Sequence, residues 1–214
     1  MTEVSTRLAG IRERIERAGR DPKDVTIVAV TKGFEASACK LALEAGLTVL
    51  GENRVKEALQ KMRIVDGATW HLIGHLQTNK VRQAAGRFAV IQTVDSLHLA
   101  EALAEVNPSQ QVLIEVNVAR EPQKSGADPD SASDLIEGAA RLLDVRGLMA
   151  MGPTEGDPGP AFHELARIRD GAQERIGRSL PVLSMGMSGD FEAALAAGST
   201  MLRLGQALFG PRPT

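Results

Sequence analysis

The sequence predicts a single (β/α)8 barrel of 214 residues with an extra helix at its start. Short apolar runs rich in valine and isoleucine alternate with longer stretches at helical spacing, which predicts parallel strands joined by helices. Eight strand candidates can be counted, and eight strand–helix units close a barrel of this kind. The composition, 43% hydrophobic and 24% charged, is that of an ordinary globular chain.

The elements are expected in a regular order. An amphipathic helix covers about residues 2–19. Strands follow at residues 26–30, 47–51, 69–74, 88–94, 111–118, 145–151, 181–186 and 200–205. The helices between them include ASACKLALEAG, RVKEALQKM, LHLAEALAEV, residues 131–143, FHELARIRDGAQERI and FEAALAAG. Gly46 and Gly198 end two of these helices and suit a left-handed cap.

The whole chain, residues 1–214, is expected to form one domain. An open doubly wound sheet is the alternative fold, but no GxGxxG motif follows the first strand, which weakens a dinucleotide-binding interpretation. Residues 120–130 and 153–160 form the only long polar loops, and both follow strands. Loops after strands lie on the C-terminal face of a barrel, where binding sites are built.

Charge and cysteine content exclude several classes of function. The net charge of −2 and the pI of about 6.1 leave no basic excess that would attract nucleic acid. The single cysteine, Cys39, cannot form an internal disulfide and fits a reducing compartment. The charged start lacks the apolar stretch of a signal peptide, and no later run reaches the ~18 apolar residues of a membrane span. We therefore expect a cytoplasmic protein.

Residues 26–34 read TIVAVTKGF, so an apolar strand runs directly into Lys32. In a barrel, this amine would point into the mouth. A lysine after a strand more often reaches solvent, because its ammonium group is strongly hydrated. Desolvation would instead lower the pKa of the amine and leave it able to attack a carbonyl as a Schiff-base lysine. A phosphate site elsewhere on the same face would favour this second interpretation.

Two loops on that face predict such a phosphate site. Residues 184–198 follow the seventh strand, and Gly186 and Gly189 allow a ligand to approach the backbone closely. Ser188 is expected to cap the next helix, whose first N–H groups favour an anion. Gly205 opens a short helix after the eighth strand. Barrels often hold phosphate with the loops after strands seven and eight, although glycine and serine can simply make tight turns.

Arg203 lies within the last strand candidate between two leucines, where a guanidinium needs a partner. It is expected either to pair with a carboxylate such as Glu115 or to face a ring nitrogen of a ligand. Asn53 ends the second strand and could cap the following helix or reach a ligand.

Other reactive side chains predict no site. His71 and His75 are four residues apart, but His71 belongs to a strand and no acidic residue lies between the two, so a zinc site is not expected. Cys39 is expected in the core rather than as a nucleophile. Neither a GxSxG motif nor a Ser-His-Asp order supports a hydrolase.

Taken together, AVTKG, LGEN, WHLIGHLQTNK, KSG, GLMAM and LSMGMSGDFEAALAAGSTMLRLGQALFG resemble the pyridoxal phosphate homeostasis protein family over about residues 25–212. The resemblance implies a barrel of the alanine racemase N-terminal-domain type. It implies that pyridoxal 5′-phosphate (PLP) is bound as an internal aldimine on Lys32. The cofactor-binding residues carried over are Lys32, Asn53, Ser188, Arg203, Gly205 and Gln206, with no metal.

The resemblance assigns a role to each end of the cofactor. Ser188 and the backbone N–H groups of Gly205 and Gln206 would hold the phosphate, and Asn53 would lie close to the cofactor. Arg203 would face the pyridine nitrogen and disfavour its protonation, which restrains carbanion chemistry. Gln206 departs from the threonine or serine of many relatives, so one phosphate hydrogen bond is in doubt while the backbone donor remains.

Two functions are compatible with this resemblance. The first is a PLP-binding protein that serves PLP homeostasis by buffering or delivery to PLP-requiring apo-enzymes, without dedicated turnover. The second is a PLP-dependent amino-acid racemase with weak activity. Related racemases use a tyrosine from a second domain as the other base, and this chain contains no tyrosine. The binding role is therefore preferred, with a monomer as the default assembly. A class I aldolase-like barrel is a third interpretation, but its lysines lie on later strands.

Overall fold

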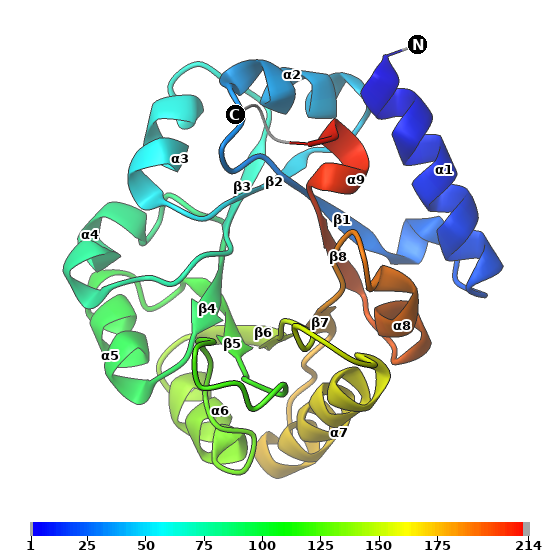
Figure 1. Cartoon of the computed structure of the whole chain (residues 1–214). Coiled ribbons are helices and arrows are strands. Elements are labelled where there is room, and N and C mark those ends of the chain that lie inside the picture. The colour runs from blue at the N-terminus through cyan, green and yellow to red at the C-terminus, as the bar shows by residue number, and fades with distance from the viewer. Residues whose placement is uncertain (1, 212–214) are drawn as a thin grey trace.

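The computed structural model describes residues 2–211 and shows a closed barrel of parallel strands that pair in chain order from β1 to β8 (Figure 1). This confirms the predicted fold class. The strands are β1 Thr26–Val30, β2 Val49–Glu52, β3 Thr69–Leu72, β4 Val90–Val94, β5 Gln111–Glu115, β6 Asp144–Met149, β7 Val182–Ser184 and β8 Met201–Leu204.

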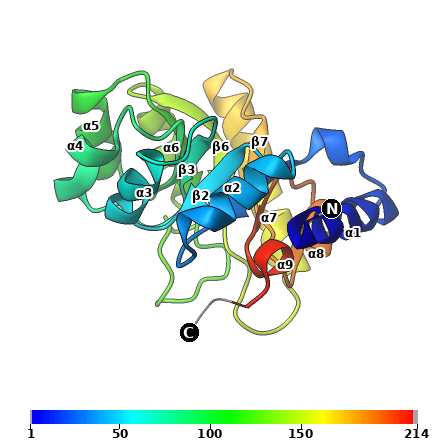
Figure 2. The same cartoon turned by 90° about the horizontal axis from the view of Figure 1, so that it is seen from above.

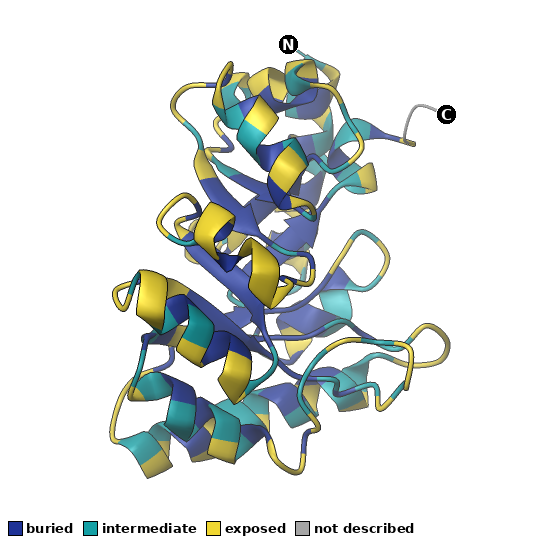
Figure 3. Cartoon of the chain, turned by 90° about the vertical axis from the view of Figure 1, so that its left-hand side faces the viewer, coloured by how far each residue is buried: buried dark blue, intermediate teal, exposed yellow. Residues whose placement is uncertain are grey.

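Helices form a ring outside the strands (Figure 1). They are α1 Glu3–Arg17, α2 Ala36–Glu44, α3 Val55–Met62, α4 Val81–Ala84, α5 Leu97–Val106, α6 Ala132–Ala140, α7 Gly159–Ile176, α8 Phe191–Ala196 and α9 Gln206–Phe209, with 3-10 turns at Pro22–Asp24 and Thr78–Lys80. Their outward faces are exposed, whereas the strands inside are buried (Figure 3). The extra helix α1 packs on α8 and α9.

The barrel closes where β8 pairs with β1. Val28 lies opposite Arg203, and Ala29 lies opposite Leu204. Val28, Ala29 and Leu204 are fully buried, as expected for parallel strands that are covered on both faces. This pairing brings the first and last strands side by side, so the loops that follow them share one rim.

Several strands are shorter than the sequence predicts, and the difference falls mostly at their C-terminal ends. β5 ends at Glu115 rather than at residue 118, and β7 ends at Ser184 rather than at residue 186. The apolar pattern continues because loop residues such as Val116 and Met185 are buried against the core. Ile73, Gly74, Met151 and Gly205, which were also expected within strands, line a cavity at this end of the barrel.

The long loops that follow β5 and β6 project beyond the barrel on the same side as α9 (Figure 2). The short helix α4 was not predicted, because four residues are too few to show a helical period. Gly46 and Gly198 have φ angles of 84° and 91°, which confirms the predicted left-handed caps. Between residues 2 and 211, no helix combines the length and apolarity needed to cross a membrane.

Gly186 provides a test of this packing, because its φ of 97° is unfavourable for other residues and a Cβ there would lie 2.7 Å from the Ala194 Cβ. We expect Gly186→Ala to lower the free energy of unfolding by about 2–4 kcal/mol through backbone strain and overpacking. Gly189→Ala is the matched control in the same loop, since a Cβ added there would meet no atom of the neighbouring elements within 4 Å. Urea unfolding of both variants measures the difference, and equal midpoints would contradict the packing.

Candidate functional site

A cavity of about 420 Å³ opens at the C-terminal ends of the strands, which is a size typical of small-molecule sites. It contains all six residues selected from the sequence. Its lining residues are Val30, Lys32, Asn53, Ile73, Gly74, His75, Glu115, Ser125, Met151, Met187, Ser188, Gly189, Arg203, Gly205 and Gln206. We call this cavity the barrel mouth. The fold places the six residues around the barrel mouth, and their roles in binding stay predictions.

Lys32 lies two residues beyond the end of β1, with its side chain partly buried. It lines the barrel mouth and also a smaller adjoining cavity with Gly33, Asn53, Arg54 and Glu57. This position favours the interpretation of Lys32 as a site residue over that of a lysine directed to solvent. An amine here shares a cavity with the loops predicted to hold phosphate.

Asn53 does not cap the helix after β2, because α3 begins one residue later than a cap at Asn53 would require. The N-cap of α3 is Arg54, which makes no side-chain cap hydrogen bond. Asn53 instead lines the barrel mouth, where its backbone lies against Gly74. A Cβ at Gly74 would lie 2.3 Å from the main-chain oxygen of Asn53, so glycine is required for this close approach.

Ser188 does not cap α8, in contrast to the expectation from the sequence. The N-cap of α8 is Asp190, and the Ser188 Oγ accepts a hydrogen bond of 3.1 Å from the N–H of Ala207 in α9. The loop after β7 is thereby tied to the helix after β8. The first N–H groups of a helix have no acceptor within the helix. The main-chain N–H groups of Gly205 and Gln206 also have no hydrogen-bond acceptor elsewhere among residues 2–211, so they are available to an anion.

Within residues 2–211, the acceptors of the Arg203 guanidinium belong to Ser184 and Ala150 and not to the carboxylate of Glu115. Its Nη1 donates to the main-chain oxygen and Oγ of Ser184 at 2.7 and 2.8 Å, and its Nη2 donates to the main-chain oxygen of Ala150 at 2.8 Å. Burial lowers its pKa to about 10, although nearby carboxylates oppose this effect. The guanidinium therefore stays charged at pH 7 and is held rigidly in the wall of the barrel mouth.

A chain of hydrogen bonds continues from Arg203 into the barrel. Ser184 Oγ donates to Gln92 Oε1 at 2.7 Å, and Gln92 Nε2 lies 2.9 Å from His71 Nδ1. Burial lowers the pKa of His71 to about 4, so its ring is neutral at pH 7. His71 does not line the barrel mouth, whereas His75 does and lies beside Asp95 at 3.3 Å. Among the described residues, no group of three or more His, Cys, Asp or Glu side chains is placed to hold a metal ion.

Glu115 is the acidic group of the barrel mouth, and the sequence suggested it only as a partner for Arg203. It ends β5 and is 2% exposed, and its Oε2 has no hydrogen-bond partner among the described residues. Burial, assisted by the negative charge of Asp95 and opposed by Arg203, raises its pKa to about 7. A buried polar atom without a partner in a cavity wall is unfavourable unless a ligand satisfies it.

Ile73, His75, Ser125 and Met151 also line the barrel mouth, although none of them was predicted as a site residue. Ile73 and His75 belong to the run HLIGH, residues 71–75, which begins in β3 and continues beyond it, and this motif was the only available signal for them. Ser125 comes from the polar loop of residues 120–130, and Met151, which was expected to end a strand, lies two residues beyond the end of β6. The positions of Ser125 and Met151 depend on how the loops after β5 and β6 fold back over the barrel, which residue pattern alone does not specify.

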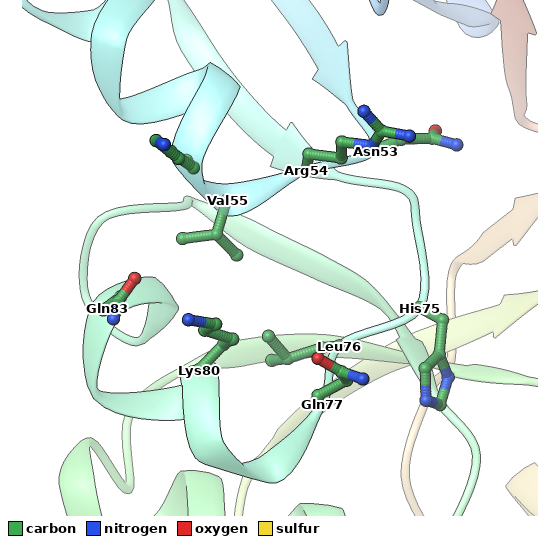
Figure 4. Close-up of a pocket in the computed structure, with 9 residues that line it drawn as sticks. Asn53, Arg54, Val55, His75, Leu76, Gln77, Lys80 and Gln83 are labelled. Atoms are coloured by element: carbon green, nitrogen blue, oxygen red, sulfur yellow. The ribbon is translucent and has the colours of Figure 1, made fainter.

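A second cavity of about 380 Å³ adjoins the barrel mouth, and the two share Asn53 and His75. It lies between the start of α3 and the region of α4 (Figure 4). Val55 and Leu76 supply its apolar part, and its remaining lining residues are Arg54, Lys56, Gln77, Lys80 and Gln83. The rim of the barrel on this side is therefore positively charged.

Comparisons with known proteins agree on one family. The family model described as "Alanine racemase, N-terminal domain" matches residues 7–213. The chain is 39% identical to the pyridoxal phosphate homeostasis protein of Escherichia coli strain K12, over 99% of this chain and 98% of that protein. It is 40% identical to the protein of the same name from Pseudomonas aeruginosa, over 95% of this chain and 92% of that protein.

Solved structures extend the comparison. PipY of Synechococcus elongatus without PLP has a TM-score of 0.87 at 34% identity, covering 97% of this chain and 100% of that chain. PipY with PLP bound has a TM-score of 0.85 at 33% identity with the same coverage. Alanine racemase from Bacillus anthracis shares the fold, with a TM-score of 0.73 at 19% identity. The match covers 99% of this chain and 56% of the racemase chain.

The raised pKa of Glu115 predicts a pH-dependent cost to stability. The carboxyl group has an ordinary pKa of 4.5 and a folded-state pKa of about 7, so the folded chain binds the proton more tightly. Protonated Glu115 therefore contributes to the free energy of unfolding below pH 4.5, and this contribution is lost as the pH rises through about 7. The free energy of unfolding falls by up to about 3 kcal/mol over this range. We expect Glu115→Gln to gain stability relative to the parent between pH 5 and pH 8. A constant difference in urea unfolding across this range would contradict the assignment.

Proposed function

The chain belongs to the pyridoxal phosphate homeostasis protein family, and from this premise we propose that it binds PLP in the barrel mouth and serves PLP homeostasis without dedicated turnover. One observation carries the proposal. The barrel mouth combines the amine of Lys32 with the N–H groups that begin α9, and these lie on the first and last units of the barrel. An amine and an anion cradle in one cavity suit a phosphorylated aldehyde.

The phosphate end of the proposed site fits the residues present. Gly205 and Gln206 offer main-chain N–H groups, and Ser188 joins them through its contact with Ala207. Backbone donors at a helix start favour an anion regardless of side chain. We therefore propose that the phosphate binds through these backbone donors without a hydroxyl at position 206, where many relatives carry threonine or serine.

Lys32 is proposed to hold the aldehyde end covalently. PLP, when bound, supplies an aldehyde and a ring that withdraws electrons. Arg203 is proposed to face the ring nitrogen as a permanent cation, which keeps that nitrogen from being protonated and weakens the ring as an electron sink. Asn53 is proposed to line the cofactor beside Lys32.

The absence of turnover rests on the lack of a second proton-transfer group of the racemase type. The chain contains no tyrosine. His71 is held by Gln92 and lies outside the lining of the barrel mouth. Lys32 is partly exposed and Gln206 is exposed, so a bound cofactor could be exchanged from solvent. We extend the proposal to buffering or delivery toward PLP-requiring apo-enzymes, by a monomeric chain in the cytoplasm.

Chemical trapping tests the covalent attachment. We expect the protein incubated with PLP to turn yellow, and borohydride reduction to leave one pyridoxyl group on the peptide that contains Lys32. Lys32→Ala should lose the modification, while Lys56→Ala, which replaces an exposed lysine of the neighbouring cavity, should keep it. Peptide mapping by mass spectrometry reads the outcome. Modification spread over surface lysines, and unchanged in Lys32→Ala, would exclude this site.

A second variant tests the phosphate end. Ser188→Ala removes the acceptor of the Ala207 N–H and is expected to weaken PLP binding about fivefold, the effect of one lost hydrogen bond. Binding of pyridoxal, which lacks the phosphate, should change less than about twofold. Titration followed by absorbance compares the two ligands. An equal loss for both would show that Ser188 does not act on the phosphate.

A further inference from the structure

A buried cluster of charged side chains lies beside the segment that carries Lys32. Lys61 projects from α3, and its side chain is only 8% exposed. Its Nζ lies 2.6 Å from Glu52 Oε1 and 2.8 Å from Glu57 Oε1. The Thr31 Oγ1 donates to the same Glu52 oxygen at 2.6 Å. The function proposed above uses none of these groups.

This cluster holds the main chain on both sides of Lys32. Lys61 Nζ donates to the main-chain oxygen of Thr31, the preceding residue, at 2.8 Å. Glu57 Oε1 accepts from the N–H of Gly33, the following residue, at 2.9 Å. Gly33 has a φ of 74°, so the chain turns immediately after Lys32. Two side chains of α3 therefore fix the backbone from which the Lys32 side chain departs.

Stability alone does not account for the cluster. Burial lowers the pKa of Lys61, but its hydrogen bonds to Glu52 and Glu57 outweigh this and leave the pKa raised, so the ammonium stays charged. Glu52 Oε2 has no hydrogen-bond partner within residues 2–211. A buried ion pair commonly stabilises no more than apolar side chains of similar volume. What an apolar side chain at position 61 could not provide is an attachment for the main-chain oxygen of Thr31.

We propose that Lys61 and Glu57 are positioning residues that clamp residues 31 and 33 and so direct the Lys32 amine into the barrel mouth. This inference rests on the proposed function, since it concerns how the amine meets the cofactor aldehyde. A group that must react at one carbon gains from fixed orientation, and hydrogen bonds to its supporting backbone provide it. The clamp acts on the aldehyde end of the ligand and has no contact with the phosphate end.

Two ligands separate this role from general damage to the fold. PLP engages Lys32, whereas 4′-deoxypyridoxine 5′-phosphate keeps the ring and phosphate but has no aldehyde. For Lys61→Met and Glu57→Ala we expect the dissociation constant for PLP to rise about tenfold, with that for the deoxy analogue within about twofold of the parent. Glu57→Gln keeps an acceptor for Gly33 and should restore most PLP binding. Lys56→Met replaces the neighbouring exposed lysine of α3 and should change neither constant.

Each outcome decides the matter. An equal loss of both ligands in Glu57→Ala, whose residue is only half-buried, would assign the cluster a structural role and overturn the clamp. Unchanged binding of both ligands in Glu57→Ala would overturn it as well. If the parent binds the deoxy analogue but does not attach PLP to Lys32, the proposed function fails first, and the clamp fails with it. If Lys61→Met does not fold, the two dissociation constants of Glu57→Ala still decide between the clamp and a structural role.

Discussion

The pairing of β1 with β8 is the interaction on which the candidate site depends. It closes the barrel with Val28 opposite Arg203, and it places the segment after β1 beside the segment after β8. Lys32 and Gly205, which are far apart in the sequence, thereby line one cavity. Neither segment could form an amine-and-anion site alone. The hydrogen bond from Ala207 to Ser188 then adds the loop after β7 to the same rim.

Buried charges in and around the barrel mouth separate structural groups from groups that face a ligand. Arg203 is surrounded by three oxygen acceptors, and Lys61 by two carboxylates and a main-chain oxygen. Glu115 is equally buried, but its Oε2 has no partner in the described part of the chain and its side chain lines the cavity. Arg203 and Lys61, whose N–H groups have acceptors, fix the walls. Glu52 Oε2 in the Lys61 cluster also lacks a partner within residues 2–211, but Glu52 does not line the barrel mouth, so of these two carboxylates Glu115 is the one that an occupant of the cavity can reach. Because desolvation without compensation is unfavourable, this difference marks where a ligand completes the structure.

Sequence patterns were sufficient for the architecture and singled out five of the six residues around the barrel mouth as candidates, whereas Gln206 was selected only through the family resemblance. Strand–helix alternation is a local property, so the architecture could be predicted. A glycine-rich loop after a strand can make either a tight turn or a phosphate site, and two such loops on one face favoured the phosphate site. The hydrogen-bond partners of individual side chains could not be predicted in this way. Ser188 was expected to cap α8 but accepts a hydrogen bond from α9. For Asn53 a cap and a ligand contact were both open, and it precedes the N-cap and lines the barrel mouth. For Arg203 a carboxylate and a ligand were both open, and its acceptors within the chain are Ser184 and Ala150. No sequence pattern indicated that Lys61 is buried, because a lysine in a helix is normally exposed. Its burial depends on the carboxylates of Glu52 in β2 and Glu57 one turn earlier in α3.

The most direct test of the central claim, that the barrel mouth is a PLP site built by closure of the barrel, is a crystal structure of the protein grown with PLP. The account predicts electron density continuous from Lys32 Nζ to the cofactor. It also predicts that the phosphate contacts the N–H groups of Gly205 and Gln206, with Arg203 at the ring nitrogen. PLP bound at another cavity, or in the barrel mouth with its phosphate away from α9, would contradict it.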